Sequence, residues 1–359
     1  MASEIFIKIK NHSAVIIKLL PLIAFTVPLA LLYFLNLPDP YLGPSSQYSF
    51  QLMWKGRTFE LFFIWLIALE FILSWENIKL KINKQNKAEL LAVVIALMLP
   101  TLFVISEYFL GLNSSIASIS LQNGITFGNS MPIATEYLVF SGLFCLSTFL
   151  FFGKKGLKGF ALPALFVALV GVIYTIDNVF PYGQFTPFQL LVPTTANLAA
   201  FVLGLMGYTT IHGTDSGMPT LQVTGSLGTA KFAIAWPCAG IESLLIFTAV
   251  TLLFLQRIPM SWKAKVGYFA IGAAVTYFIN VLRIATIFII GTQAGGDINA
   301  PQVRDFHNYF GPIYSIAWIV SYPLIIIASQ SLWRKINKEK VVHAKENSMK
   351  PQSTLPNPV

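Results

Sequence analysis

The amino-acid sequence predicts an all-α polytopic membrane protein with about eight transmembrane helices, a re-entrant or interfacial helical segment and a short outer β-hairpin. Hydrophobic residues make up 55% of the 359 residues, and charged residues only 11%. A soluble domain typically has about 25% charged residues, so this chain cannot surround an apolar core with a water-facing shell. Long apolar runs recur along the chain, whose mean hydropathy is +0.68. The lipid bilayer is therefore the expected solvent of the fold.

Eight apolar runs are predicted to cross the membrane as helices. About 20 residues suffice, because each residue rises about 1.5 Å and the hydrocarbon layer is about 30 Å thick. The first run is too long for a signal-peptide core and lacks a clear small-residue cleavage site, so we expect a retained anchor. The runs cover residues 14–36, 58–75, 88–110, 131–152, 159–178, 238–256, 266–290 and 310–332.

A ninth apolar stretch, residues 188–211, is interrupted by one proline and three polar residues, Pro193, Thr194, Thr195 and Asn197. If this stretch crossed the membrane, every later segment would change sides. If it does not cross, 19 of the 24 lysines and arginines fall on one side of the membrane. That asymmetry matches the positive-inside rule, so both termini are expected in the cytoplasm. We therefore expect a re-entrant or interfacial helix pair at the outer face.

The next segment, residues 212–235, is predicted to form the β-hairpin on the outer surface. Two short runs, 220–223 and 231–234, are separated by Gly225 and Gly228, as expected of strands joined by a turn. Residues 334–359 are polar and contain prolines, which predicts a disordered cytoplasmic tail. The chain thus divides into N-terminal transmembrane helices over 1–187, a core over 188–333 and this tail.

Cys238 is the candidate nucleophile of the core. It follows Pro237 and precedes Ala239 and Gly240, so it is expected in the first turn of a helix at the outer surface. Unpaired amides and the positive end of the helix dipole would favour a thiolate there, and the small neighbours leave room for a substrate backbone. The alternative is a small apolar side chain, as we interpret Cys145. Two cysteines provide neither a disulfide framework nor a four-ligand zinc site, so we expect no metal and no cofactor.

Arg283 and His307 share the expected membrane face of Cys238. Arg283 lies about two turns inside its helix, where a guanidinium without a partner is costly. His307 stands at the outer entrance to the last helix, where a solvated loop histidine is the alternative. Together the three residues have the composition of a cysteine acyl-transfer site. His307 would accept the thiol proton, Cys238 would hold the acyl group, and Arg283 would stabilise the oxyanion or orient the carbonyl.

Several neighbours are candidates for supporting roles. Glu242, four residues after Cys238, is expected on the same helix face, where it could pair with Arg283 or receive a positive group of a substrate. Asn280 precedes Arg283 by three residues and could bond within the same cavity. For Asn280, and for Arg304 and Asp305 beside His307, a structural or solvated role is the favoured interpretation.

Three segments, Pro237-Cys-Ala-Gly-Ile, Asn280-Val-Leu-Arg-Ile and His307-Asn-Tyr-Phe-Gly, together resemble the exosortase/archaeosortase family in order and approximate spacing. The resemblance covers roughly residues 190–332 and makes the core exosortase/archaeosortase-like. Two departures place the subgroup in doubt: Ala239 stands where many members have serine, and the third motif has His307 where some archaeal branches have arginine.

The resemblance implies a membrane-embedded, sortase-like cysteine peptidase or transpeptidase of the plasma membrane with its active site at the outer face. Its substrates would be exported proteins whose C-terminal tail comprises a recognition motif, a membrane helix and a basic cluster. The motif-matching Cys238, Arg283 and His307 would form the catalytic set. The cleaved carboxyl end would pass to an acceptor such as a lipid or a glycan, or to water.

Parts of the sequence also fit other functions, of which a transporter or channel is the main alternative. A noncatalytic transporter or channel would use an interrupted segment such as 188–211 and a membrane acid such as Glu70. His212, Asp215 and Ser216 supply the residue types of a serine triad but crowd into one loop. Asp177 and Asp297 faintly suggest an aspartyl protease. The net charge of +9 comes in short clusters between apolar runs, which is typical of membrane topology and not of nucleic-acid binding.

Overall fold

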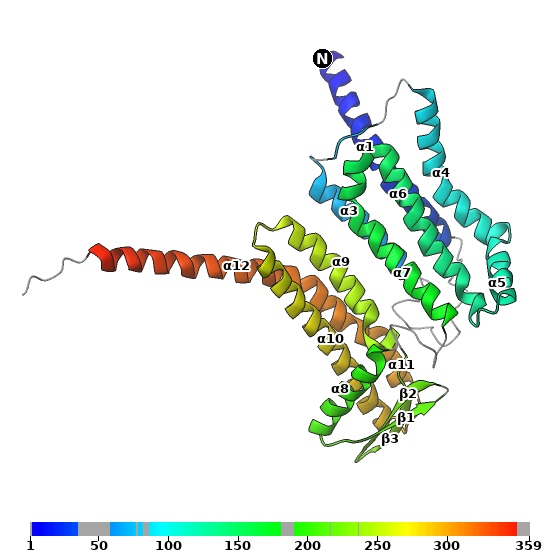
Figure 1. Ribbon diagram of the computed structural model, residues 1–359, viewed down its shortest axis with the longest axis vertical. Helices are drawn as coiled ribbons and strands as arrows, with labels where there is room; N and C mark the ends of the chain where they lie inside the picture. The colour runs from blue at the N-terminus through cyan, green and yellow to red at the C-terminus, as the bar shows by residue number, and fades with distance from the viewer. Residues whose placement is uncertain are drawn as a thin grey trace, which may run out of the picture.

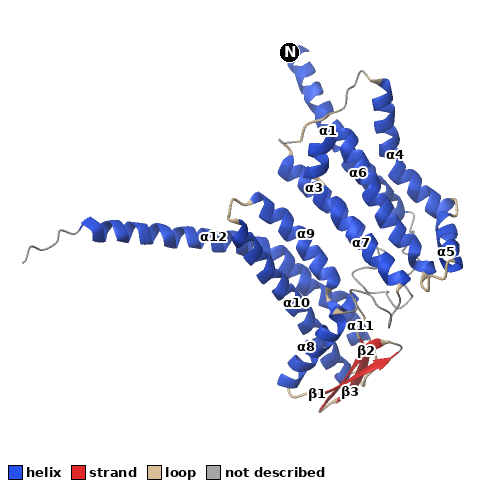
Figure 2. Ribbon diagram, viewed as in Figure 1, coloured by secondary structure: helices blue, strands red, loops and turns tan. Residues whose placement is uncertain are grey.

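The computed structural model describes residues 2–34, 58–76, 78–81, 86–180, 190–215, 217–235 and 237–349, and it consists mainly of helices with one small sheet. Figure 1 shows two neighbouring helical groups, and Figure 2 places the sheet at one end of the second group. The all-α polytopic class predicted from the sequence is confirmed by this architecture.

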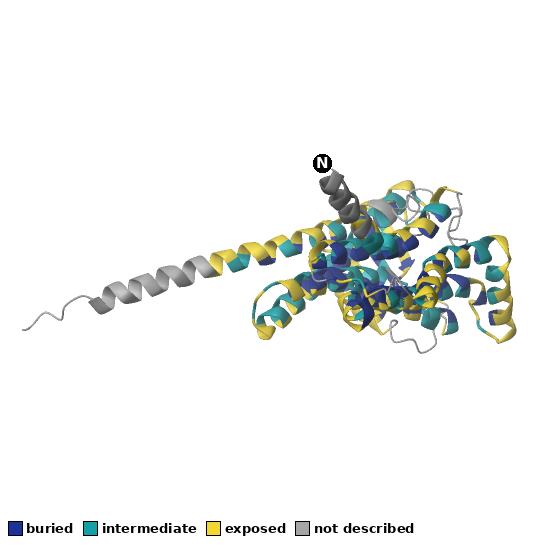
Figure 3. Cartoon of the chain, turned by 90° about the horizontal axis from the view of Figure 1, so that it is seen from above, coloured by how far each residue is buried: buried dark blue, intermediate teal, exposed yellow. Residues whose placement is uncertain are grey.

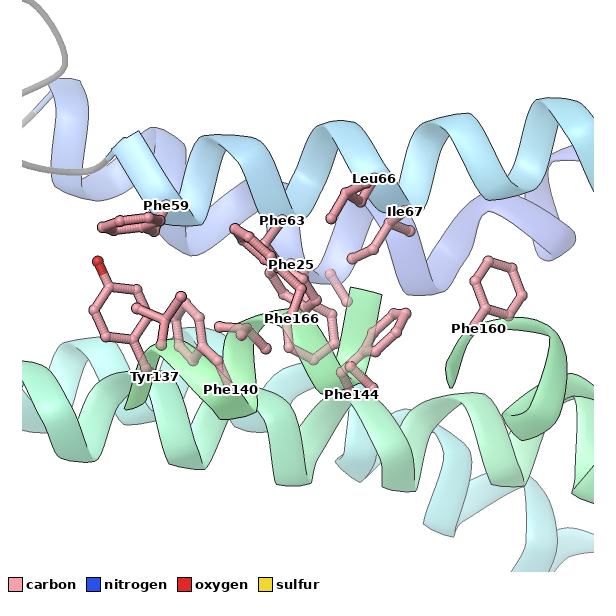
Figure 4. Close-up of a cluster of buried hydrophobic side chains, with 14 of the residues drawn as sticks. Phe25, Phe59, Phe63, Leu66, Ile67, Tyr137, Phe140, Phe144, Phe160 and Phe166 are labelled. Carbon is pink, nitrogen blue, oxygen red and sulfur yellow. The ribbon is translucent and has the colours of Figure 1, made fainter. Parts of the chain in front are cut away.

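The first group contains the helices before residue 180. Their bounds are α1 Ala2–Phe34, α3 Thr58–Ser74, α4 Lys87–Phe109, α5 Leu112–Gln122, the short 3-10 helix η2 Gly128–Ser130, α6 Met131–Gly159 and α7 Ala161–Val179. Aromatic rings fill the space between these helices (Figure 4). Phe25 of α1 makes edge-to-face contacts with Phe63, Phe140 and Phe144, with ring centroids 5.4 to 6.0 Å apart.

The second group carries the sheet and the candidate site. Its elements are α8 Leu191–Leu205, β1 Thr209–Asp215, β2 Met218–Gly225, β3 Gly228–Ala233, the 3-10 helix η3 Pro237–Ala239, α9 Ile241–Arg257, α10 Trp262–Gln293, α11 Pro301–Asp305, the π-helix η4 Phe306–Phe310 and α12 Gly311–Met349. Helix α9 connects the two groups, because its Ala249 belongs to the buried core of the first group.

Within the described residues, six helices are long and apolar enough to cross a bilayer: α1, α4, α6 with η2, α7, α10 and α12. Between 22% and 50% of each spanning window is buried inside the protein, so the remaining apolar surface needs lipid. Exposed positions accordingly lie around the periphery of both groups (Figure 3). The other two predicted spans, α3 and α9, have 17 residues each, which is about 25 Å of helix.

The basic segments meet at one end of the molecule. The ammonium of Lys18 donates to the carbonyl of Trp75 at 3.2 Å and lies over its ring. At the same end, the amide of Lys81 donates to the carbonyl of Phe151 at 2.8 Å. The α9–α10 connection also lies at this end, and the sheet lies at the opposite one (Figure 1).

A partly buried ion pair connects the basic end of α9 to α3. Arg257 pairs with Glu70 and donates to the hydroxyl of Ser74 at 2.6 Å. Ser74 in turn donates to the same carboxylate at 3.2 Å. Glu70, the acid that a transport pathway could have used, therefore has a structural role as the partner of Arg257.

Residues 188–211 differ from the expected helix pair. The structure has one helix, α8, of 15 residues, and then β1 begins at Thr209. Residues 181–189 lie outside the described part of the chain. The run Thr209, Thr210 and Ile211 is β-branched, and such residues fit a pleated sheet better than a helix. At about 22 Å, α8 is too short for a 30 Å hydrocarbon layer, as the non-spanning prediction requires.

Among the described residues, the sheet has three antiparallel strands in the order β1-β2-β3, where a two-stranded hairpin was predicted. Both expected strands are present, as parts of β2 and β3, and Gly225 lies opposite Gly228 at their turn. The additional strand β1 pairs with β2 from Thr209 opposite Thr224 to Asp215 opposite Met218.

The C-terminal segment also differs from the prediction. Helix α12 continues to Met349 and projects away from the remaining helices (Figures 1 and 3), where residues 334–359 were expected to be disordered. The sequence has neither glycine nor proline between Pro323 and Pro351, so nothing in the backbone chemistry stops the helix earlier. Residues 350–359 lie outside the described part.

Candidate active site

Cys238 lies on the short 3-10 turn η3, between β3 and α9. This corrects the expectation that it belongs to the first turn of the following helix, because α9 begins only at Ile241. Gly240 interrupts the helix with a φ of +91°, a left-handed conformation that favours glycine. The turn therefore places Cys238 just ahead of the helix, where it is partly buried.

Asn280 holds the cysteine turn from α10. Its side chain is fully buried, and its Nδ2 donates to the carbonyl of Cys238 at 2.7 Å. A Cβ atom at Gly240 would lie 2.9 Å from Cγ of Asn280, so the missing side chain makes this approach possible. Gly240 thus provides space for Asn280, whereas the sequence suggested that the small residues leave room for a substrate.

Thr195 of α8 is a supporting residue that sequence reasoning did not assign to the site. It is completely buried, and its hydroxyl lies 2.7 Å from the hydroxyl of Tyr277 and 3.5 Å from the carbonyl of Ala239. A polar residue in an apolar helix can indicate a role in a site. The contact of Thr195 with Tyr277, however, depends on the packing of α8 on α10 and cannot be predicted from the sequence.

His307 reaches Cys238 from the π-helix η4, at the start of the last long helix. Nε2 of the imidazole lies 3.3 Å from Sγ of Cys238, which is hydrogen-bond distance for sulfur. A π-helix adds one residue to a turn, changes the direction of its side chains and is often found at functional sites. The sequence predicted a shared membrane face for these two residues, and the structure brings their side chains into direct contact.

Arg283 of α10 contacts the histidine through the backbone. One terminal nitrogen of its guanidinium donates to the carbonyl of His307 at 2.8 Å. A Cβ atom at Gly311 would lie 2.6 Å from Nε of Arg283, so this glycine lets the guanidinium reach the turn. Nε itself is buried and has no hydrogen-bond partner among the described residues. The arginine therefore positions the histidine turn and places a positive charge beside it.

The surroundings of Cys238 favour the thiolate. Burial alone raises the pKa of the thiol, because a thiolate loses hydration in a protein interior. The hydrogen bond and charge of His307 and the charge of Arg283 act in the opposite direction, while the carboxylate of Glu242 opposes them. The net result is a pKa of Cys238 below its ordinary value, which is the condition for a nucleophilic cysteine.

Glu242 acts on the site through its charge, and Asp305 pairs with its neighbour Arg304. Glu242 follows the break at Gly240, so it does not continue a helix face from Cys238, and it makes no hydrogen bond or ion pair with another described residue. Its influence on the thiol is electrostatic. Asp305 lies 3.7 Å from Nε of Arg304, so these two neighbours of His307 interact with each other.

A cavity of about 260 Å³ opens beside the sulfur of Cys238. Ala233 of β3 forms one wall, and apolar side chains of α10, including Ile284 and Phe288, form another. The remaining lining residues include Ile298 of the loop before α11, Val303 of α11 and His307. The thiol and the imidazole thus share one largely apolar pocket that could receive a side chain next to the reacting bond.

The other residue patterns of the sequence form no comparable site. His212 and Asp215 are three residues apart on the exposed strand β1, so their side chains point to opposite faces, and Ser216 lies outside the described residues. Asp297 accepts a hydrogen bond from the amide of Asn299 at 2.8 Å and stabilises a turn. Within the described ranges, no group of histidine, cysteine and acidic residues is arranged to hold a metal ion.

The reactivity of Cys238 tests the electrostatics of the site. In a Cys145→Ala background, we expect alkylation of Cys238 by iodoacetamide to have a pH–rate inflection below that of a free thiol. His307→Gln should move this inflection to higher pH and slow alkylation at pH 7 by about tenfold, because an ordinary thiol is only a few per cent thiolate there. His212→Gln is the matched control on exposed β1 and should change neither value. An unchanged inflection in His307→Gln would contradict the thiol–imidazole interaction.

Comparison with known families identifies the family of this chain. The family model of the transmembrane exosortases matches residues 54–321, which is well over half of the chain and includes Cys238, Arg283 and His307. No curated protein and no solved structure matches the chain. The match also covers most of the membrane helices around the site. The chain therefore belongs to the transmembrane exosortase family.

Proposed function

We propose that this protein is a cysteine peptidase or transpeptidase that cleaves the C-terminal sorting tails of exported proteins. Membership of the exosortase family implies a membrane-embedded function in processing sorting signals. The assignment as a cysteine peptidase or transpeptidase rests on one observation. Sγ of Cys238 lies 3.3 Å from Nε2 of His307 at the wall of a largely apolar cavity. A thiol next to an imidazole is the minimal pair for nucleophilic attack on a peptide carbonyl.

In the first half of the reaction, the proton of Cys238 moves to His307 and the thiolate attacks the scissile carbonyl carbon. A carbon–sulfur bond forms, and the carbonyl oxygen becomes an oxyanion. The carbon–nitrogen bond then breaks, and His307 gives its proton to the departing amine. The substrate's membrane helix leaves with that amine, while the exported domain stays on Cys238 as a thioester.

In the second half, an acceptor attacks the thioester. His307 removes a proton from the attacking hydroxyl, amine or water, and the carbon–sulfur bond breaks to restore the thiol. Water would give a released protein, whereas a lipid or glycan acceptor would give an anchored one. We propose transfer to such an acceptor at the cell surface, with no cofactor in the cycle.

Arg283 supports both halves by position and by charge. Its bond to the carbonyl of His307 keeps the imidazole turned toward the sulfur. Its positive charge favours the thiolate and would also stabilise an oxyanion formed close to it. Asn280 acts on the other partner, because it holds the carbonyl of Cys238. Both side chains come from the same helix, so their spacing is fixed by the backbone of α10.

The active site is proposed to face the outside of the plasma membrane, with both termini in the cytoplasm. The α3–α4, α6–α7 and α9–α10 connections, which contain most of the basic clusters between the helices, lie at the end opposite the sheet (Figure 1). Because clusters of lysine and arginine remain on the cytoplasmic side, the sheet and the adjacent cysteine turn would lie outside. Exported substrates become available on that side.

Processing of a tailed substrate tests the catalytic assignment. The reporter is an exported domain followed by a C-terminal tail from a secreted protein of the same genome, with a short motif, an apolar helix and basic residues. We expect the wild-type chain to shorten this reporter and Cys238→Ala to abolish cleavage, because no other group replaces the thiol. Cys145→Ala should cleave normally. Equal cleavage by Cys238→Ala at equal protein level would refute the assignment.

Thiol labelling in intact cells tests the orientation. A membrane-impermeant maleimide added outside should modify Cys238 and leave Cys145 unmodified, because the first lies on the sheet side and the second inside α6. Cys238→Ala provides the background signal. Labelling of Cys238 only after the cytoplasmic side is opened to the reagent would reverse the proposed topology.

A further inference from the structure

Strand β3 is an edge of the sheet, and its backbone groups alternate between a paired and an open side. Its one neighbour is β2, so every second residue of β3 directs its N–H and C=O groups away from the sheet. The amide of Ile234 donates to the carbonyl of Pro219 at 2.8 Å, which fixes the phase of this alternation. With the register of β3 on β2, the outward residues are Thr229, Lys231 and Ala233.

One end of this edge is closed and the other is open. A Cβ atom at Gly296, just after α10, would lie 2.6 Å from the carbonyl oxygen of Thr229, so the chain there covers the edge. No backbone hydrogen bond is present for the outward groups of Lys231 and Ala233 within the part of the chain that the structure describes. The open part of the edge is therefore confined to the end of β3 nearest to Cys238.

The open edge faces the reaction cavity. Phe232 packs against Phe288 of α10, with ring centroids 5.2 Å apart, and this contact fixes β3 on the helix. Ala233 and Ile234 line the same cavity as Cys238 and His307. A chain that lies along this edge would therefore reach the sulfur within a few residues, because an extended residue spans about 3.3 Å.

The other edge of the sheet does not have this property. In β1 the same alternation directs the backbone of Thr210, His212 and Thr214 outward. None of these residues lines the cavity that contains Cys238. The edge of β1 is therefore chemically equivalent to that of β3 but is not connected to the thiol, which makes it an internal control.

We infer that the segment of the substrate next to the scissile bond binds as an added β-strand along Lys231 and Ala233 of β3. This inference rests on the proposed function and specifies how its substrate is held. Main-chain hydrogen bonds to a sheet edge hold an extended peptide without regard to its sequence, while pockets select alternate side chains. The apolar cavity beside Cys238 is such a pocket. The short open edge accommodates about four residues, which limits recognition to a short motif.

A proline on β3 tests this mode of binding. Ala233→Pro removes an outward N–H without removing a bond to β2, and proline is tolerated on sheet edges. We expect cleavage of the tailed reporter to fall by about tenfold or more, because one hydrogen bond is lost and the ring occupies the path of the substrate. Thr214→Pro, the equivalent change on the edge of β1, should cleave at nearly the wild-type rate, because Thr214 does not line the cavity.

A cross-linking experiment tests the same inference without relying on the fold of the proline variant. Lys231→Cys is placed in a chain that carries Cys238→Ala and Cys145→Ala, and single cysteines are moved along the motif of the reporter. Disulfide formation should peak at alternate residues, because side chains two apart in a strand share one face. Uniform or absent cross-linking, together with normal cleavage by Ala233→Pro, would overturn the inference.

The two proposals fail in different ways. If the wild-type chain leaves the reporter intact, or Cys238→Ala still cleaves it, the proposed function is wrong. If the wild-type chain cleaves, Cys238→Ala does not, and both β3 experiments are negative, the enzyme is correctly assigned and strand addition is wrong. Alternating cross-links with an inactive Ala233→Pro support both.

Discussion

Two hydrogen bonds from one helix hold the candidate site together. Asn280 and Arg283 of α10 donate to the carbonyls of Cys238 and His307, at 2.7 Å and 2.8 Å. Residues three apart lie on the same face of a helix, so a single rigid element holds the backbones that carry the thiol and the imidazole. A hydrogen bond of this kind contributes about 0.5 to 1.5 kcal/mol to stability. The polar residues of α10 thus stabilise the fold and fix the geometry of the site.

The same arrangement explains why charged groups are tolerated at this depth. Removing one member of a buried charged cluster costs several kcal/mol, whereas a complete cluster compensates its own desolvation. Here the positive charge of Arg283 lies close to the thiol of Cys238 and to the carboxyl group of Glu242, and it favours the negative form of both. The thiolate and Arg283 therefore stabilise each other. Gly240 and Gly311 permit this close packing, because a Cβ atom at either position would collide with Asn280 or Arg283.

Much of the architecture could be predicted from the sequence, because apolar length and charge asymmetry follow directly from bilayer physics. The pairing of Cys238 with His307 could be inferred only as a shared membrane face. Three local features were missed: the 3-10 turn of Cys238, the π-helix of His307 and strand β1. The cysteine turn depends on a tertiary contact, Asn280 filling the space at Gly240, whereas β1 begins at a β-branched run that was predicted as part of a helical stretch. The sequence predicted a catalytic role for Arg283 but not its hydrogen bond to the carbonyl of His307, because every residue has a backbone carbonyl and no residue type indicates such a partner.

The central claim is that Cys238 forms a covalent acyl intermediate with the substrate. Rapid acid quenching during cleavage of a tailed reporter, followed by digestion and mass spectrometry, would detect that species directly. The account requires an adduct on the peptide that contains Cys238, with the mass of the acyl fragment, that hydroxylamine removes as expected of a thioester. Cleavage that proceeds with no such adduct under single-turnover conditions, or with an adduct on another residue, would contradict it.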